Sequence, residues 1–152
     1  MLIHNLKVGI EVEIMWFDQN VIEYQFRCSN GRFSGVAELY LSHDDLAKMV
    51  EALKGFPSVP SDIRDLELGT FNPKHADGGL HLRCYCKDSV GHAVIEVKLR
   101  GDACKGLGEP ESVALLFPVE AAAVDLFLTQ VRLMDTEQIG ATAFLAMTPC
   151  WP

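Results

Sequence analysis

Two cysteines and two histidines lie close enough in the sequence to raise the question of a metal site. Cys84-Tyr-Cys86 is flanked by His81 and His92. Structural zinc sites usually pair ligands across about two to four intervening residues and need a second pair to complete the tetrahedron. Here the thiols alternate onto the apolar phase of a predicted strand, where cysteine behaves as a small hydrophobic residue, and His81 takes the opposite phase. We therefore interpret both cysteines as core residues and expect no metal and no cofactor.

Two carboxylates, Glu11 and Glu13, occupy alternate positions of another predicted strand. Their Cα atoms would lie about 6.7 Å apart, because a strand rises about 3.3 Å per residue, and this separation suits paired acids in glycoside hydrolysis. Glutamate at alternate positions is also the ordinary way in which a half-exposed strand presents a polar face to water. We adopt the second interpretation.

Two loops contain further residues that are common in active sites. His75-Ala-Asp77 pairs an imidazole with a carboxylate, but no serine or cysteine nucleophile stands in a recognisable elbow. Gly106-Leu-Gly108 lacks the lysine and hydroxyl residue of a phosphate-binding loop. The sequence therefore identifies no catalytic residue, and we predict that the protein is not an enzyme.

The elements that must position these side chains begin with three predicted strands. Apolar residues alternate over positions 8–14, 22–28 and 33–41, and Asn30-Gly31 predicts a hairpin turn. The period changes at Ser42, where an N-cap and an acidic first turn begin a helix. The inward positions of that helix are Leu46, Met49, Val50 and Leu53.

The second half of the chain repeats this order of elements. A strand over 63–71, whose phase is uncertain, precedes a hairpin in which Leu80, Leu82, Cys84 and Cys86 face inward. The return strand directs Ala93, Ile95, Val97 and Leu99 inward and exposes Glu96, Lys98 and Arg100. A short strand over 113–117 then leads to a helix over 121–134, with an apolar face formed by Val124, Phe127, Leu128 and Val131.

These elements predict an α+β fold. We expect antiparallel sheet of about six to seven strands, joined by short turns, with two amphipathic helices on one side. The order of elements is consistent with an internal βββα pseudo-repeat, with halves at 1–56 and 62–135. We assign a single domain to 1–135 and a C-terminal tail to 136–152, where the periodicity is weak.

The net charge and the number of cysteines limit the classes of function that the protein could have. The formal net charge of −8 disfavours binding to nucleic acid and to anionic membranes, which depends on clustered lysine and arginine. No apolar stretch approaches the roughly 20 residues that span a bilayer, and the first residues do not resemble a secretory signal. The five cysteines are odd in number and show no disulfide framework, so we expect a cytoplasmic protein.

The charges are unevenly distributed over the outward positions of the predicted strands. The first three strands expose mostly carboxylates against Arg27, whereas the later hairpin exposes mostly cations around Tyr85, against Glu96. Tyrosine and arginine are enriched at binding hot spots. The candidate binding residues are Glu11, Glu13, Glu23, Glu38, Arg83, Tyr85, Lys98 and Arg100.

Several short motifs resemble those of small bacterial proteins of unassigned function, including the WapI-like immunity proteins of polymorphic toxin systems. They are Trp16-Phe-Asp18 closing the first strand, Phe33-Ser-Gly35 opening the third, Asp45-Leu46, Gly91-His92 and the final apolar strand that leads into a Leu/Phe helix. The resemblance spans about positions 8–133. It implies a stoichiometric binder with an acidic surface that blocks a toxin domain.

Three functional hypotheses follow. The leading one is a non-enzymatic protein-binding domain, with an immunity-type inhibitor of a basic, cationic toxin domain as its specific form. The alternative is a small-molecule-binding domain or an uncharacterised enzyme, with a pocket between sheet and helices lined by Trp16, Phe17, Tyr24 and His75. The third is a homodimer through edge strands or hydrophobic faces, which is compatible with either of the others.

Overall fold

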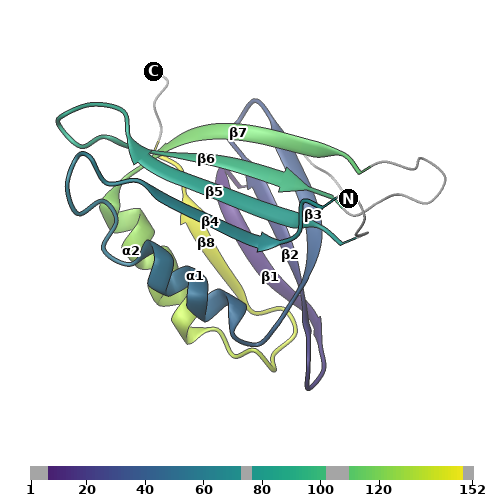
Figure 1. The fold of residues 1–152 in the computed structure, drawn as a ribbon. Helices are drawn as coiled ribbons and strands as arrows, with labels where there is room; N and C mark the ends of the chain where they lie inside the picture. Colours follow the sequence, from purple (N-terminus) through teal and green to yellow (C-terminus); the bar gives the residue numbers. More distant parts are fainter. Residues whose placement is uncertain (1–6, 73–76, 102–109, 149–152) are drawn as a thin grey trace.

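The computed structural model describes residues 7–72, 77–101 and 110–148. In these ranges the chain forms eight strands and two helices (Figure 1). The strands are β1 (Gly9–Phe17), β2 (Ile22–Ser29), β3 (Ser34–Leu41), β4 (Arg64–Gly69), β5 (Gly79–Cys86), β6 (Ala93–Arg100), β7 (Ser112–Val119) and β8 (Thr142–Ala146), and the helices are α1 (Asp45–Leu53) and α2 (Ala121–Leu133).

The strands form two four-stranded antiparallel sheets, which confirms the predicted α+β class. One sheet has the order β3-β2-β1-β8 and the other the order β4-β5-β6-β7. The strand count exceeds the predicted six to seven because the segment 136–152 is not simply a tail. It contributes β8, in which Ala143 and Leu145 are buried and pair with Val12 and Ile10 of β1.

The two sheets have the same construction. Each contains a meander of consecutive antiparallel strands, β1-β2-β3 or β4-β5-β6-β7, whose last strand is followed by a helix. In the second sheet the four strands are consecutive in sequence, whereas the first sheet takes its outermost strand, β8, from the end of the described chain. Along the chain the two halves are therefore β1-β2-β3-α1 and β4-β5-β6-β7-α2, and the internal βββα pseudo-repeat stays a prediction.

The edge strand β3 runs along one end of the second sheet. Two glycines permit this close approach: a Cβ atom at Gly35 would lie 2.6 Å from Val113 Cγ1, and one at Gly78 would lie 2.5 Å from the main-chain oxygen of Glu38. In Figure 1 β3 passes the ends of β4, β5, β6 and β7. Strands of one sheet that run across those of the other are typical of orthogonal sheet packing.

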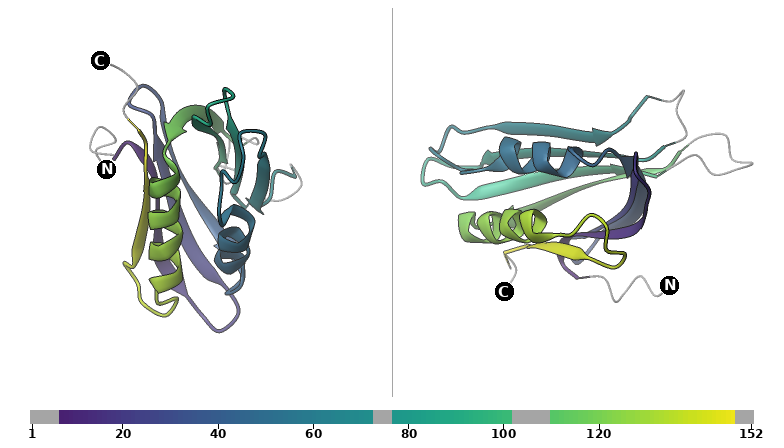
Figure 2. Two further views of the ribbon diagram at one scale, coloured as in Figure 1. Left: turned by 90° about the vertical axis from the view of Figure 1, so that its left-hand side faces the viewer. Right: turned by 90° about the horizontal axis from the view of Figure 1, so that it is seen from below.

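The other edge strands are also covered. The Leu116 oxygen of β7 accepts a hydrogen bond from Asn30 in the β2–β3 hairpin, and the Pro118 oxygen accepts one from the Thr148 N–H. Edges β4 and β8 lie beside α1 and α2, which pack against each other on the open side of the two sheets (Figure 2). A dimer through edge-strand pairing would have to displace these contacts.

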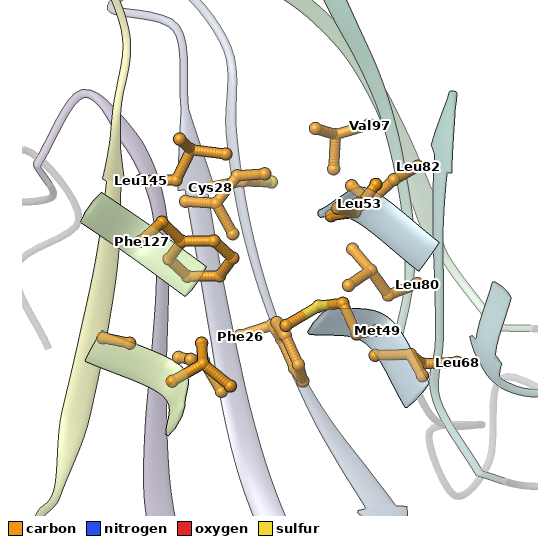
Figure 3. Close-up of a cluster of buried hydrophobic side chains, with 14 of the residues drawn as sticks. Phe26, Cys28, Met49, Leu53, Leu68, Leu80, Leu82, Val97, Phe127 and Leu145 are labelled. Atoms are coloured by element: carbon orange, nitrogen blue, oxygen red, sulfur yellow. The ribbon is translucent and has the colours of Figure 1, made fainter. Parts of the chain in front are cut away.

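The core fills the space between the two sheets and the helices (Figure 3). The predicted inward positions of both helices and of β1, β2, β5 and β6 are confirmed, apart from Val8, which lies before β1 and is 40% exposed, and Cys86, which is half-buried. Phe33, which was included in the alternating range 33–41, is 61% exposed because it belongs to the hairpin turn and β3 begins only at Ser34. Neither helix in the described part of the chain is long and apolar enough to cross a bilayer.

Candidate binding surfaces

The outward residues of the first sheet form ordered cross-strand rows, which we call the acidic face. One row joins Glu11 of β1 to Arg27 of β2, and the next joins Glu13, Gln25 and Glu38. Directly opposed residues of antiparallel strands point to the same side of the sheet, so the four predicted glutamates share one surface. This places Glu11, Glu13, Glu23 and Glu38 together.

Arg27 neutralises one end of the acidic face. Its Nη2 atom lies 2.7 Å from Glu11 Oε1 and 2.9 Å from Glu13 Oε1, and Lys7 Nζ lies 3.0 Å from the other Glu11 oxygen. Burial acts to raise the pKa of the Glu11 carboxyl, but the hydrogen bonds and charges of Arg27 and Lys7 outweigh it, so this pKa lies below its ordinary value. The charges of Glu11 and Glu13 are therefore compensated by ion pairs within the protein.

The opposite end of the acidic face keeps its negative charge. Glu23 accepts a hydrogen bond of 2.8 Å from the Tyr40 hydroxyl, and Glu38 accepts one of 3.0 Å from Gln25 Nε2. Among the residues that the structure describes, neither carboxylate has an ion-pair partner. The uncompensated charge of this face is thus concentrated at Glu23 and Glu38.

Two aromatic side chains flank this charge. Trp16 pairs with Glu23 across β1 and β2, and Glu23 pairs with Tyr40 across β2 and β3, so the three form one row. Trp16 and Tyr40 are each 45% exposed. Tyr40 is not among the predicted binding residues, although its outward phase in the third strand is a signal for it, and Trp16 was expected to line an interior pocket.

The predicted basic region on the β5–β6 hairpin is shared with carboxylates from β4. Asp65 lies opposite Arg83 and contacts both its Nη1 atom, at 3.3 Å, and His81 Nε2, at 2.7 Å. The phase of β4, uncertain from sequence, directs Asp65 and Glu67 outward and Leu68 inward. This face therefore carries mixed charge. Tyr85 and Lys98 lie on it, with Lys98 Nζ 5.5 Å from the Phe71 ring centroid.

Arg100 is not an exposed binding residue, and the sequence prediction was wrong here. It is only 4% exposed, and its Nη1 atom donates to the main-chain oxygens of Thr70 and Asp77. The alternating phase directs Arg100 outward, but its guanidinium is held by the main-chain oxygens on either side of the β4–β5 connection. Arg100 therefore holds a loop in place rather than contacting a partner.

The cysteines and histidines of the suggested metal site do not converge. Cys84 is buried, whereas His81 bonds to Asp65 on the outer face and His92 bonds to Asp88, 2.6 Å away. Burial raises the pKa of the Cys84 thiol to about 12 and that of Cys28 to about 11, which leaves little reactive thiolate at neutral pH. In the described ranges no three acidic, histidine or cysteine side chains form a group suited to a metal ion.

The interior pocket of the alternative hypothesis is not assembled from its proposed residues. Tyr24 is fully buried on the inner face of the first sheet, whereas Trp16 projects from the outer face. His75, the proposed polar residue of this pocket, lies outside the described residues, and so does the separate loop candidate Gly106-Leu-Gly108. The Tyr24 hydroxyl has no hydrogen-bond partner in the described part of the structure, and burial followed by the charge of Asp45 raises its pKa to about 12.

Comparisons with protein-family models, with curated proteins and with solved structures find no match to this chain.

Proposed function

We propose that the protein is a non-enzymatic protein-binding domain that recognises a cationic partner through the acidic face. The observation that carries this proposal is the arrangement of Glu23 and Glu38, which lack ion-pair partners among the described residues, beside the exposed rings of Trp16 and Tyr40. Glu11 and Glu13 support this surface through Arg27 but do not contribute most of its charge.

Lysine and arginine side chains suit such a surface for two reasons. A guanidinium or ammonium group forms charge-assisted hydrogen bonds with carboxylates, and it also interacts favourably with the face of a tryptophan or tyrosine ring. The unpaired carboxylates would accelerate association with a basic protein, whereas the aromatic side chains would supply most of the short-range affinity. Both kinds of group occur here in adjacent cross-strand rows.

The specific form that we propose is an immunity-type inhibitor, which blocks a cationic toxin domain by covering its surface. The net charge of −8 favours a basic target, and inhibition by coverage requires no catalytic group in the inhibitor. We place this activity in the cytoplasm. The free thiols of Cys28, Cys84 and Cys86 are consistent with a reducing compartment.

The test is native co-purification followed by charge reversal. Tagged protein is isolated at moderate salt from its own organism, and a stoichiometric basic partner is then measured against the double variant Glu23→Lys/Glu38→Lys. The matched control is Glu51→Lys/Glu137→Lys, which changes the net charge by the same amount at exposed positions outside the acidic face. We expect the first variant to slow association about tenfold or more, and the control to have a much smaller effect.

The result must also distinguish an inhibitor from other binding proteins. Co-expression with the captured partner should restore growth if the partner is toxic, and the Glu23→Lys/Glu38→Lys variant should fail to do so. Equal slowing by both double variants would show that only net charge matters and would exclude the acidic face as the interface. Recovery of the protein without any stoichiometric basic partner would contradict the proposal as a whole.

A further inference from the structure

A groove of about 520 Å³ is lined by residues of the β2–β3 hairpin and of β7, which Asn30 joins by a hydrogen bond. The hairpin provides one wall with Arg32 and Phe33. The floor comes from β6 and β7 and includes Val94, Leu116 and Pro118. This volume falls within the range of about 300–1,000 Å³ that is typical of small-molecule sites.

Asn30 holds the hairpin wall in position. Its Oδ1 atom accepts the main-chain N–H groups of Arg32, at 3.0 Å, and Phe33, at 2.9 Å. Its Nδ2 atom donates to the Leu116 oxygen at 3.2 Å, which ties the turn to β7. The wall is therefore formed before any ligand arrives, so little conformational entropy would be lost on binding.

The lining of the groove is largely apolar and partly aromatic. Phe33 is 61% exposed and Leu116 is 54% exposed, which is unusual for two large apolar side chains that border one concave surface. Tyr85 lies opposite Val94 across β5 and β6 and borders the same hollow. Aromatic rings stack favourably on one another, so this lining suits an aromatic ligand body.

The charged residues of this lining are both cations. Arg32 lies in the hairpin wall, and Lys87 follows β5. No described carboxylate forms an ion pair with Lys87, whereas Arg83, farther along β5, lies beside Asp65. A cationic lining on a chain with a net charge of −8, in which Lys87 has no described ion-pair partner, favours an anionic group on the ligand.

The outer edge of β7 does not favour an added peptide strand. The oxygens of Leu116 and Pro118 already accept hydrogen bonds from Asn30 and Thr148, and Pro118 has no N–H to donate. A peptide that binds by strand addition needs these main-chain groups. Recognition at the groove must therefore depend on its apolar lining and its cations, which favours a small molecule over an extended peptide.

We propose that this groove binds a small aromatic carboxylate, with its ring between Phe33, Tyr85 and Leu116 and its carboxylate toward Arg32 and Lys87. The site shares no residue with the acidic face. Its occupation is therefore independent of the proposed protein partner, and the two proposals can fail separately.

The test uses naphthoate as the probe and naphthamide as its neutral analogue of similar shape. Each is titrated into the full chain while the methyl resonances of Val94, Ala114 and Leu116 are followed by NMR. We expect naphthoate to shift these resonances and naphthamide to bind roughly tenfold more weakly, because it lacks the charge-assisted hydrogen bonds. Lys87→Gln should remove most of this preference for the acid.

Leu116→Asp should abolish naphthoate binding, because it places a carboxylate in the groove. The matched control is Leu126→Asp on α2, where the leucine is 58% exposed and lies outside the groove, and it should bind naphthoate as the parent chain does. Circular dichroism establishes that both variants are folded. Equal affinity for acid and amide, or shifts confined to other residues, would overturn the proposal. Binding of an acidic peptide without naphthoate binding would overturn it in favour of a protein-docking surface.

Discussion

The buried guanidinium of Arg100 donates a hydrogen bond of 2.8 Å from Nη1 to the main-chain oxygen of Asp77. The same nitrogen donates to the oxygen of Thr70 at 3.0 Å. These bonds fasten both ends of the loop between β4 and β5 to the end of β6. Arg100 thus stabilises the end of the second sheet at which β3 passes close to Gly78.

We expect Arg100→Lys to lower the free energy of unfolding by about 1–3 kcal/mol, because a single ammonium group cannot reproduce the geometry of the guanidinium and buried carbonyls would lose their donor. Urea denaturation measures the change. The control is Arg83→Lys on the neighbouring strand, whose side chain is 46% exposed, and it should stay within about 0.5 kcal/mol of the parent. Equal losses in both variants would contradict this role of Arg100.

Gly78→Ala should destabilise the crossing of β3 over the second sheet. The new Cβ atom would lie 2.5 Å from the Glu38 oxygen and 3.0 Å from the Arg100 oxygen, and these main-chain atoms cannot move as a flexible side chain can. Overpacking of this kind costs about 1–3 kcal/mol, which thermal or urea unfolding would detect. Gly101→Ala, whose Cβ atom would have its nearest neighbour at 3.8 Å, should be tolerated. An unchanged free energy of unfolding for Gly78→Ala would contradict the close approach of β3 at this position.

Tyr24→Phe should stabilise the protein by about 1 kcal/mol at neutral pH, because it removes a buried hydroxyl that has no hydrogen-bond partner among the described residues. The pKa of Tyr24 is raised from 10.0 to about 12, so between these pH values the folded chain keeps a proton that the unfolded chain releases. The contribution of this raised pKa to the free energy of unfolding is therefore fully present below pH 10, and it is lost as the pH rises toward 12. Tyr24→Phe should flatten that decline, as measured by urea denaturation at a series of pH values.

Arg27→Gln should raise the pKa of Glu11, because burial of the carboxyl would no longer be offset by the arginine. In the parent the lowered pKa means that Glu11 contributes stability above its unfolded value of about 4.5, and this contribution is lost as the pH falls through the lower folded value. The variant should lose this acid dependence. NMR titration of the Glu11 carboxyl carbon measures the pKa directly, and an unchanged value would refute the role assigned to Arg27.

Trp16→Ala tests the proposed protein-binding function. If the acidic face is the interface, loss of this ring should lower the affinity for the partner by roughly thirtyfold or more, the effect expected of a hot-spot residue. The fold should survive, because Trp16 is 45% exposed. Leu133→Ala, at a residue on α2 that is 79% exposed, serves as the control for loss of an exposed apolar side chain. Unchanged affinity for Trp16→Ala would place the interface elsewhere.

Much of the local structure could be predicted because alternation and helical spacing are properties of neighbouring residues. The four inward positions of each helix and the inward phases of β1, β2, β5 and β6 follow from the period of the apolar residues. The grouping of the four glutamates also follows, because each has the outward phase of its strand. The local pattern of apolar residues was sufficient to predict the inward positions wherever one face of an element is buried and the other is exposed to solvent.

Tertiary structure decided the features that depend on partners distant in sequence. The pairing of β8 with β1 joins opposite ends of the described chain, and nothing in the weak periodicity of 136–152 identifies that neighbour. The hydrogen bonds of Arg100 to Thr70 and Asp77 join residues more than twenty positions apart, and the pairing of Arg83 with Asp65 depends on the register of β4. The sequence by itself thus determined the elements and their buried faces, because these arise from local periodicity. Which charges remain uncompensated, and where a groove forms, depended on long-range packing that local periodicity does not encode.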